Sequence, residues 1–326
     1  MLNKTILVFR KKTKVFNSIE NVFDALSQFL DTEKIELPYE SLGLVLRLKN
    51  IRFLSQYNKQ RIHITGHDHY LLWFPFAKKV ILTIHDIEAL KRKRGIKRWI
   101  FKKLWFDLPI ANAAEVTTIS EFTKKELRSL KAYRTPITVI PNPLTLPLVA
   151  APTVFNSACP RILHLGTKAN KNLRTLLQAI QGINCELIVV GRPNKQIENE
   201  ISSVSFKYRF LSGLSNNQVM HEYIKCDLVS FVSYYEGFGL PIIEAQAAGR
   251  PVITSNITSM PEVAGDGALL VNPYSVEEIR TGIINLIRDS ELRNSLISKG
   301  TENVRRFDPK VIAVQYKKLY EKVNQI

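Results

Sequence analysis

The sequence is poor in residues that cross-link a chain or anchor it in a membrane. Its 326 residues include three cysteines, Cys159, Cys185 and Cys226, and no Cys-x-x-Cys pair, which argues against a disulfide framework and against a zinc site. No run of eighteen apolar residues occurs, and the first ten residues reach charged side chains too early for a secretory leader. We therefore expect a cytoplasmic protein, or one held at the inner face of a membrane.

Motifs for binding metals are also missing. No Asp-x-Asp pair of the kind that holds a metal–diphosphate complex is present. His63, His67 and His69 could suggest a metal, but alternating histidines in one segment are weak evidence for a site. There is no internal repeat of 20–50 residues, which excludes solenoids. We predict no metal site.

Basic residues are abundant and unevenly distributed. The formal net charge is +17, and residues 1–150 hold 26 Lys or Arg against 13 Asp or Glu, whereas residues 151–326 hold 20 against 16. The densest basic run, residues 91–106, alternates cations with aromatic side chains, as expected for a surface that lies on anionic lipid headgroups. A merely solvated basic face is the first alternative. Nucleic acid is less favoured, because no recognition motif accompanies the charge.

The length predicts two domains, because 326 residues exceed what one hydrophobic core usually holds. Apolar strands alternate with helices in both halves, which predicts two doubly wound parallel sheets. Five prolines between positions 141 and 160 indicate the linker between the two domains. We predict an N-terminal domain at residues 1–145, a proline-rich linker at 146–160, a second domain at 161–305, and a C-terminal helical segment at 306–326 that packs back towards the first domain.

Two glutamates in an apolar segment are the strongest functional signal. Glu236 and Glu244 are eight residues apart, and the glycines between them, with Pro241, predict a loop followed by a helix that begins near Pro241. A buried strand precedes them, so free backbone N–H groups and a helix N-terminus should meet at one place. This arrangement fits an anion that carries hydroxyl groups. The alternative is a strand–helix turn with solvated glutamates.

Two further strand ends carry polar groups. Lys168 and Lys171 lie in a short turn between the strand at 161–165 and a helix, where cations and N–H groups could bind an anion. His85 and Asp86 follow the strand at 80–84, at the sheet edge where open α/β folds bind ligands. A polar pair at the end of an apolar strand favours a functional histidine over a structural one.

The segment Glu236-Gly-Phe-Gly-Leu-Pro-Ile-Ile-Glu244 resembles the Glu-x7-Glu signature of the retaining, nucleotide-sugar-dependent glycosyltransferases of family 4. That family has the GT-B fold, with two facing Rossmann-like domains and an interdomain cleft. The resemblance covers roughly residues 60–325. Its other segments are Thr83-Ile-His85-Asp86, Thr118-Ile-Ser120-Glu121, Val139-Ile-Pro-Asn142, Gly166-Thr through Lys171-Asn172, and Thr258-Ser-Met-Pro-Glu-Val-Ala-Gly265.

The resemblance assigns roles to these positions. It implies that Glu244 accepts hydrogen bonds from the nucleotide ribose, that Glu236 contacts the donor sugar and that Lys171 neutralises the diphosphate. His85 would reach the donor sugar from the first domain. An arginine often stands near the lysine in the family; here Lys168 or Arg192 would substitute for it. Backbone N–H groups would be supplied by the segments around Gly166, Gly237, Phe238, Gly239 and Leu240.

The implied activity is a retaining, metal-independent transfer of a hexose of the mannose or glucose type. The donor would be a GDP- or UDP-sugar, with no further cofactor, and the acceptor a glycan or lipid-linked glycan in bacterial surface polysaccharide or lipopolysaccharide assembly. The family's glycine-rich first turn is replaced by Arg10-Lys11-Lys12-Thr13-Lys14. The alternative is a catalytically inactive GT-B-like protein that binds a sugar nucleotide or nucleic acid.

Overall fold

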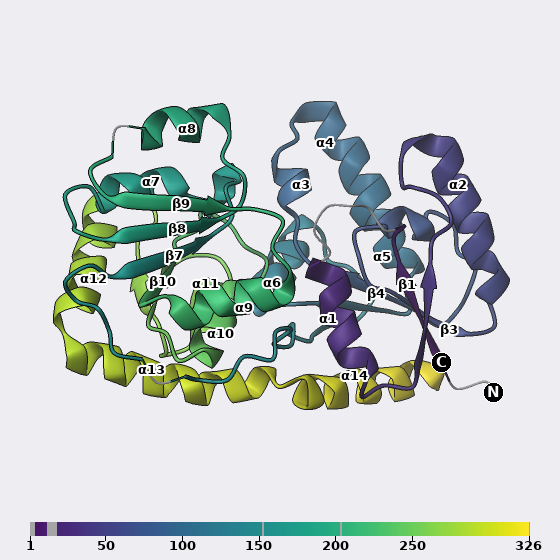
Figure 1. Ribbon diagram of the computed structural model, residues 1–326. Helices are drawn as coiled ribbons and strands as arrows, with labels where there is room; N and C mark the ends of the chain where they lie inside the picture. Colours follow the sequence, from purple (N-terminus) through teal and green to yellow (C-terminus); the bar gives the residue numbers. More distant parts are fainter. Residues whose placement is uncertain (1–3, 12–17, 152, 203, 326) are drawn as a thin grey trace. The chain divides into compact units, whose positions relative to one another are not determined.

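The computed structural model describes residues 4–11, 18–151, 153–202 and 204–325 (Figure 1). Lys12, Thr13 and Lys14 of the predicted basic turn lie outside these residues. The chain divides into two compact units. Unit 1 consists of Met1–Thr145 and Asp308–Ile326, and unit 2 consists of Leu146–Phe307, so that residues 146–160 belong to unit 2.

Unit 1 is built on a six-stranded sheet in which every neighbouring pair is parallel, in the order β2-β1-β3-β4-β5-β6. The order changes direction between β1 and β3, which is where ligands bind in open α/β sheets. The strands are β1 (Thr5–Phe9), β2 (Thr32–Glu36), β3 (Arg61–Ile64), β4 (Val80–Ile84), β5 (Glu115–Thr118) and β6 (Ile137–Val139). The helices are α1 (Ser18–Ser27), α2 (Gly43–Leu54), η1 (Ser55–Tyr57), η2 (His69–Leu72), α3 (Glu88–Lys91), α4 (Gly95–Lys102), the π-helix η3 (Lys103–Asp107), α5 (Leu108–Asn112), α6 (Glu121–Leu130) and α14 (Pro309–Asn324).

Alternate residues of β3 face opposite sides of this sheet, as the strand period requires. Ile62 and Ile64 are buried in the apolar cluster that includes residues of α2 and η2. His63 faces the other side, where its Nδ1 lies 2.8 Å from the Tyr320 hydroxyl of α14. Asp308 caps α14 by accepting a hydrogen bond from the backbone N–H of Lys310, and Pro309 occupies the first turn.

Unit 2 contains a second parallel sheet of six strands, in the order β12-β11-β10-β7-β8-β9. This is the doubly wound order in which the sequence reverses direction between β7 and β10. The strands are β7 (Arg161–Leu165), β8 (Glu186–Val190), β9 (Lys207–Leu211), β10 (Leu228–Phe231), β11 (Val252–Ser255) and β12 (Leu269–Val271). The helices are η4 (Ala169–Lys171), α7 (Leu173–Ala179), α8 (Lys195–Ile201), α9 (Asn216–Lys225), α10 (Leu240–Ala247), α11 (Met260–Ala264), α12 (Val276–Arg288), α13 (Ser290–Val304) and η5 (Arg305–Phe307).

The predicted fold class, two doubly wound parallel sheets, is confirmed. The sequence pattern did not identify β2, α2, α4 or β12. β12 has three residues and α2 exposes several leucines, so neither shows the usual apolar period. Among the described helices, none combines the length and apolar character that a membrane span needs.

Candidate functional site

The predicted anion site lies at the point where the strand order of unit 2 reverses. β7 and β10 are neighbours in the sheet, with Leu228 opposite Ile162 and Ser230 opposite His164. Their parallel direction brings the segments after Leu165 and Phe231 to the same edge. The structure therefore joins two segments that are about sixty residues apart in the chain, the turn that carries Lys171 and the loop that carries Glu236.

Lys171 and Glu236 form an ion pair at this edge. Lys171 Nζ donates to Glu236 Oε1 at 2.7 Å, and both side chains are largely buried, with 20% and 14% of their surface exposed. The ammonium group also lies 4.7 Å from the centre of the Phe231 ring. A partly buried pair is screened less by solvent than a surface pair, so each charge holds the other in position.

Gly166 makes room for the lysine side chain. Its φ of +99° is in the region that favours glycine, and a Cβ atom there would lie 2.8 Å from Lys171 Cγ. Asn172, which follows the lysine, also has a positive φ of 58° and donates hydrogen bonds from Nδ2 to the carbonyls of Val232 and Pro273. These backbone features fix the lysine turn against the loop after β10.

The loop from Glu236 to Gly239 is held by Ser259, whose hydroxyl donates to the carbonyls of Glu236 and Phe238. Gly239 has a φ of +114° and is the N-cap residue of α10, where it has no side chain to cap the helix. Pro241 stands in the first helical turn, as predicted. The Phe238 ring is buried and packs edge-on against Phe307 at 5.6 Å. The result is a rigid helix N-terminus with positive dipole character beside the ion pair.

Glu244 lies in α10 and is 7% exposed. The hydroxyl of Tyr223, which is fully buried in α9, donates to Glu244 Oε2 at 2.6 Å. Burial and the adjacent carboxylate raise the pKa of Tyr223 well above its ordinary value, so the phenol keeps its proton and remains a donor. Tyr223 was not predicted, because a single tyrosine in an ordinary helix carries no sequence signal.

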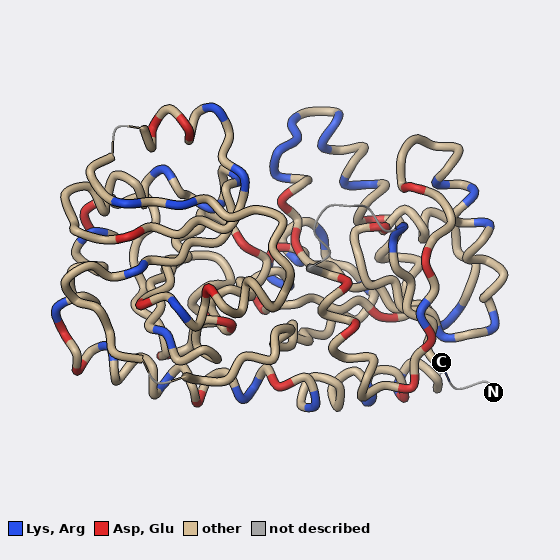
Figure 2. Tube along the Cα trace, in the orientation of Figure 1, with Lys and Arg blue, Asp and Glu red and all other residues tan. Residues whose placement is uncertain are grey.

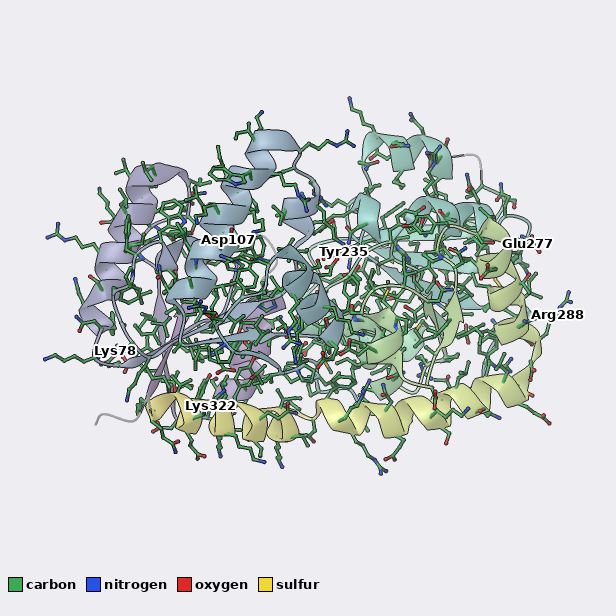
Figure 3. All side chains as sticks on the ribbon, turned by 180° about the vertical axis from the view of Figure 1, so that it is seen from behind. Lys78, Asp107, Tyr235, Glu277, Arg288 and Lys322 are labelled. Carbon is green, nitrogen blue, oxygen red and sulfur yellow. The ribbon has the colours of Figure 1, made fainter. Side chains whose placement is uncertain are left out.

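Asn170 is a second residue that sequence reasoning missed. Its Nδ2 donates to the backbone carbonyl of Tyr235 at 3.1 Å, and its backbone carbonyl accepts from the backbone N–H of Tyr234 at 2.8 Å. Tyr235 is labelled in Figure 3. The asparagine thus joins the turn after β7 to the segment after β10. Its position directly before Lys171 was the sequence signal that could have identified it.

The two cations proposed in place of the family's arginine are both exposed. Lys168 precedes η4, and Arg192 follows β8. The backbone carbonyl of Arg192 accepts a hydrogen bond from the Thr167 hydroxyl at 2.6 Å, which ties the loops after β7 and β8 together. The structure therefore places Lys168 and Arg192 on adjoining loops, with their charges at the surface.

His85 lies in unit 1, at the end of β4, and is 5% exposed. Its Nε2 is 2.7 Å from the backbone carbonyl oxygen of Thr65, which can only accept, so Nε2 carries the proton. Burial, together with the nearby His67 side chain, lowers the pKa of His85 to about 3. The ring is therefore neutral near pH 7, and Nδ1 has a lone pair that can accept a hydrogen bond.

A cavity of about 240 Å³ lies beside this strand end, within unit 1. It combines carboxylates, imidazoles, a guanidinium and aromatic rings, a set that suits a sugar because rings pack on its C–H faces while polar groups bind its hydroxyls. Its lining residues are His67, His69, Asp86, Glu88, Ala89, Arg92, Phe101, Trp105 and Phe106.

His69 gives this cavity a defined hydrogen-bonding group. Its Nδ1 lies 2.8 Å from the carbonyl oxygen of Trp105, so Nδ1 is the donor, and Nε2 has no partner among the described residues. Burial, chiefly, lowers the pKa of His69 to about 3. Nε2 therefore remains an acceptor at neutral pH. Phe101 and Trp105 stack nearly parallel at 5.0 Å beside it.

The histidines of unit 1 do not assemble a metal site. His63 is fully buried and bonded through its two ring nitrogens to Tyr320 and Thr83. Within the described parts of the chain, no group of three or more His, Cys, Asp or Glu residues is arranged to hold a metal ion. His63 therefore has a structural role in the core.

Buried neutral histidines should make the fold sensitive to acid. Burial lowers the pKa of His63, His69 and His85 to about 3 and that of His164 to about 4. Between these values and about 6.5 the unfolded chain binds more protons than the folded one, so the free energy of unfolding falls as the pH falls, by up to about 1.4 kcal/mol per pH unit for each group.

We expect urea unfolding midpoints to decrease from about pH 7 to about pH 5. A His63→Gln variant should be less stable at neutral pH but show a shallower pH dependence. His221→Gln, at an exposed position, serves as the control and should leave the slope unchanged. Equal slopes in all three proteins would contradict this prediction.

Two family models match the chain, one in each half. The model "Glycosyltransferase Family 4" matches residues 32–146, and "Glycosyl transferases group 1" matches residues 156–303. The second range contains Lys171, Glu236 and Glu244. The first contains His85 and every residue that lines the cavity.

Curated relatives and solved structures agree with these models. The chain is 27% identical over 257 residues to O-antigen chain mannosyltransferase B of Escherichia coli, a match that covers 71% of this chain and 67% of the relative. It is 28% identical over 173 residues to a phosphatidyl-myo-inositol mannosyltransferase of Mycobacterium leprae, covering 50% of this chain and 46% of that protein.

Among solved structures, sucrose-phosphate synthase of Thermosynechococcus elongatus has a TM-score of 0.82 at 20% identity, with 99% of both chains covered. Anabaena HepE, in complex with UDP and glucose, has a TM-score of 0.78 at 17% identity, with 98% of this chain and 100% of that chain covered. These likenesses establish the GT-B fold. The two family models, which together span most of the sequence, support a group 1 glycosyltransferase.

Proposed function

We propose that this glycosyltransferase moves a hexose of the mannose or glucose type from a GDP- or UDP-sugar to a glycan or lipid-linked glycan. The observation that carries the proposal is the partly buried Lys171–Glu236 ion pair, which lies at the strand reversal of unit 2 beside the N-terminus of α10. A cation, a carboxylate and the backbone N–H groups of a helix N-terminus match the diphosphate and hydroxyls of a nucleotide sugar. The mannosyltransferase relatives support the choice of sugar.

In this proposal each side chain has a separate task. Glu244, oriented by Tyr223, accepts hydrogen bonds from the ribose hydroxyls. Glu236 binds hydroxyls of the donor sugar, and Lys171 turns to the diphosphate. As the bond between the sugar and phosphate breaks, negative charge grows on the diphosphate, where Lys171 and the N–H groups of the loop before α10 stabilise it. Lys168 or Arg192 adds a further cation.

We propose transfer with retention of configuration and without a divalent metal. Retention is supported by the Glu236-x7-Glu244 signature. The ammonium group and backbone N–H groups already supply the charge that a metal would otherwise provide. Proton NMR of the new anomeric centre and activity in excess EDTA test the two statements.

His85 would contact the donor sugar through Nδ1. Its Nε2–H is used by the carbonyl of Thr65, and its low pKa keeps Nδ1 unprotonated. The group therefore acts as a fixed hydrogen-bond acceptor for a hydroxyl, and its contribution should be independent of pH in the neutral range.

The cavity of unit 1 is the proposed acceptor subsite. A sugar ring could pack on Trp105 while Asp86 and His69 accept hydrogen bonds from its hydroxyls. Asp86→Asn should lower kcat/KM for the acceptor about tenfold, because a charged acceptor becomes neutral while its bond from the Glu88 N–H can be kept. Donor hydrolysis should be unchanged, as should both rates in the control Asp24→Asn. An unchanged acceptor KM would exclude Asp86 from acceptor binding.

The proposed setting is bacterial surface polysaccharide or lipopolysaccharide assembly, with unit 1 held peripherally at an anionic membrane. The E. coli O-antigen relative supports this setting. The excess of cations in residues 1–150 supports the membrane contact.

The decisive experiment is a panel of GDP- and UDP-linked sugars, read by thermal shift and by slow donor hydrolysis. At least one donor should stabilise the protein and be hydrolysed. Stabilisation without hydrolysis or transfer would favour a catalytically inactive sugar-nucleotide binding protein. No response to any donor would reject the proposal.

A further inference from the structure

Large apolar side chains are unusually exposed in one part of unit 1. Among the described residues, sixteen large apolar or tyrosine side chains are exposed, and nine of them lie between Tyr39 and Ile100. Scattered exposed apolar residues are normal, but a concentration of this kind marks an interaction surface. Seven belong to two helices and the residue that caps one of them: Leu42, Leu44, Val45, Leu48, Ile96, Trp99 and Ile100. We call these seven residues the α2–α4 face.

α4 presents its apolar residues along one stripe. Ile96, Trp99 and Ile100 follow the i, i+3, i+4 spacing of a single helix face, and they are 69%, 64% and 45% exposed. None of the eight residues of α4 is fully buried. The helix is anchored instead through the segment that follows it, where Phe106 is buried in the core.

α2 repeats the pattern. Leu44, Val45 and Leu48 lie within one side of the helix and are 61%, 65% and 41% exposed, and Leu42 at the N-cap is 65% exposed. Towards its C-terminal end α2 carries Ile51 and Leu54, which are buried. The helix therefore exposes apolar residues in its first two turns and buries them in its last turn.

A contact links α2 to the segment that follows α4. The Arg47 guanidinium of α2 lies 4.7 Å from the ring centre of Trp105, in the segment that continues α4, and 5.6 Å from that of Tyr70. In Figure 1 and in the reverse view of Figure 3, α2 and α4 rise at the same end of unit 1. The two apolar stripes, distant in sequence, thus lie at the same end of unit 1.

Cations surround the α4 part of this face. Residues 88–103 contain eight Lys or Arg and one acidic residue, Glu88. Three acidic groups near this segment are already in ion pairs: Glu88 with Arg92, Glu126 with Lys91 and Asp107 with Lys102. Over the described parts of the chain, Arg94, Lys97 and Lys103 take part in no ion pair and are exposed. Figure 2 shows this concentration of basic residues along α3 and α4.

We infer that the α2–α4 face docks on an anionic lipid bilayer, with the seven apolar side chains in the interfacial region and the basic residues on the headgroups. Apolar stripes with flanking Lys and Arg are what an interfacial helix requires. Nucleic acid would use the cations but leave Leu44, Val45 and Leu48 without a partner. The inference rests on the proposed function in one respect: Phe101 of α4 and Trp105 of η3 line the proposed acceptor cavity, so docking brings a lipid-linked acceptor to its subsite.

The test is cosedimentation of the full-length protein with vesicles, in the absence of nucleotide sugar. The protein should bind phosphatidylcholine–phosphatidylglycerol vesicles, bind pure phosphatidylcholine vesicles weakly, and be released partly by salt. Replacing Ile96, Trp99 and Ile100 by serine, or Leu44, Val45 and Leu48 by serine, should each lower the partition coefficient about tenfold or more. The emission of Trp99 should shift to the blue on binding.

The matched control is Val311→Ser with Val314→Ser on α14, which are also exposed residues of unit 1, at 45% and 50%. This pair should leave vesicle binding unchanged. If the α2 triple variant bound as well as the wild type, the two-helix surface would be disproved. Binding to an oligonucleotide but not to vesicles would overturn the lipid assignment.

Failure of this inference can be separated from failure of the proposed function. Circular dichroism and thermal unfolding without vesicles show whether each variant is folded, and donor-induced thermal shifts report on unit 2. A wild-type protein that responds to a nucleotide sugar but ignores anionic vesicles would reject the docking surface alone. Vesicle binding without any donor response would reject the transferase proposal alone.

Discussion

Replacing Glu244 by glutamine is expected to weaken donor binding by about 10- to 100-fold, because a charge-assisted hydrogen bond contributes roughly 1.5–3 kcal/mol. The substitution preserves the side-chain volume, which matters because Glu244 is 7% exposed and an alanine would leave a cavity in α10. The Gln246 and Ala247 side chains around it are also buried. The loss should therefore report on hydrogen bonding to the nucleotide and not on packing.

Tyr223→Phe tests the orientation of Glu244 separately from its charge. The variant keeps the ring and removes the hydroxyl that lies 2.6 Å from Glu244 Oε2, so donor affinity should fall by only about two- to tenfold. Glu277→Gln, an exposed acid on α12 in the same unit, is the control and should have no effect. Affinities can be measured by calorimetry with the donor selected from the panel. A larger loss from Tyr223→Phe than from Glu244→Gln would contradict the assigned roles.

The positions of the site residues were largely predictable from the sequence. Glu236, Gly239 and Pro241 specify a loop and a helix start, and the strand before them is apolar, so a strand–loop–helix unit is the only simple interpretation. Parallel strands then bring the Lys171 turn to the same edge. The β7–β10 neighbour relation itself is a consequence of the doubly wound order.

Other features could not be predicted, because they depend on contacts between distant segments. The tyrosine that orients Glu244 comes from α9, and the rings that line the cavity of unit 1 come from α4 and η3. Whether Leu44 and Leu48 face the core or the outside depends on what packs against α2, so the sequence pattern did not distinguish them. Likewise, the tautomer of His69 follows from a carbonyl of Trp105, 36 residues away.

Lys171→Met is expected to reduce kcat about 100- to 1,000-fold, the range seen when one group that stabilises a developing anion is removed. Donor affinity should fall less, since in the proposed complex the backbone N–H groups before α10 would still contact the diphosphate. In the donor-free protein Lys171 is paired with Glu236 at 2.7 Å, so the substitution also leaves Glu236 without its cation. Single-turnover assays separate the loss in the chemical step from the loss in binding.

The Lys171–Glu236 ion pair leads to a further prediction, which would not follow if Lys171 were purely structural. Lys171→Met combined with Glu236→Gln should cost less than the product of the two single losses, because each single variant also leaves a partly buried charge unpaired and the double variant does not. Lys195→Met, at an exposed position of unit 2, is the control for removing a cation. If the two losses multiplied, the ion pair would have no part in preparing the donor site.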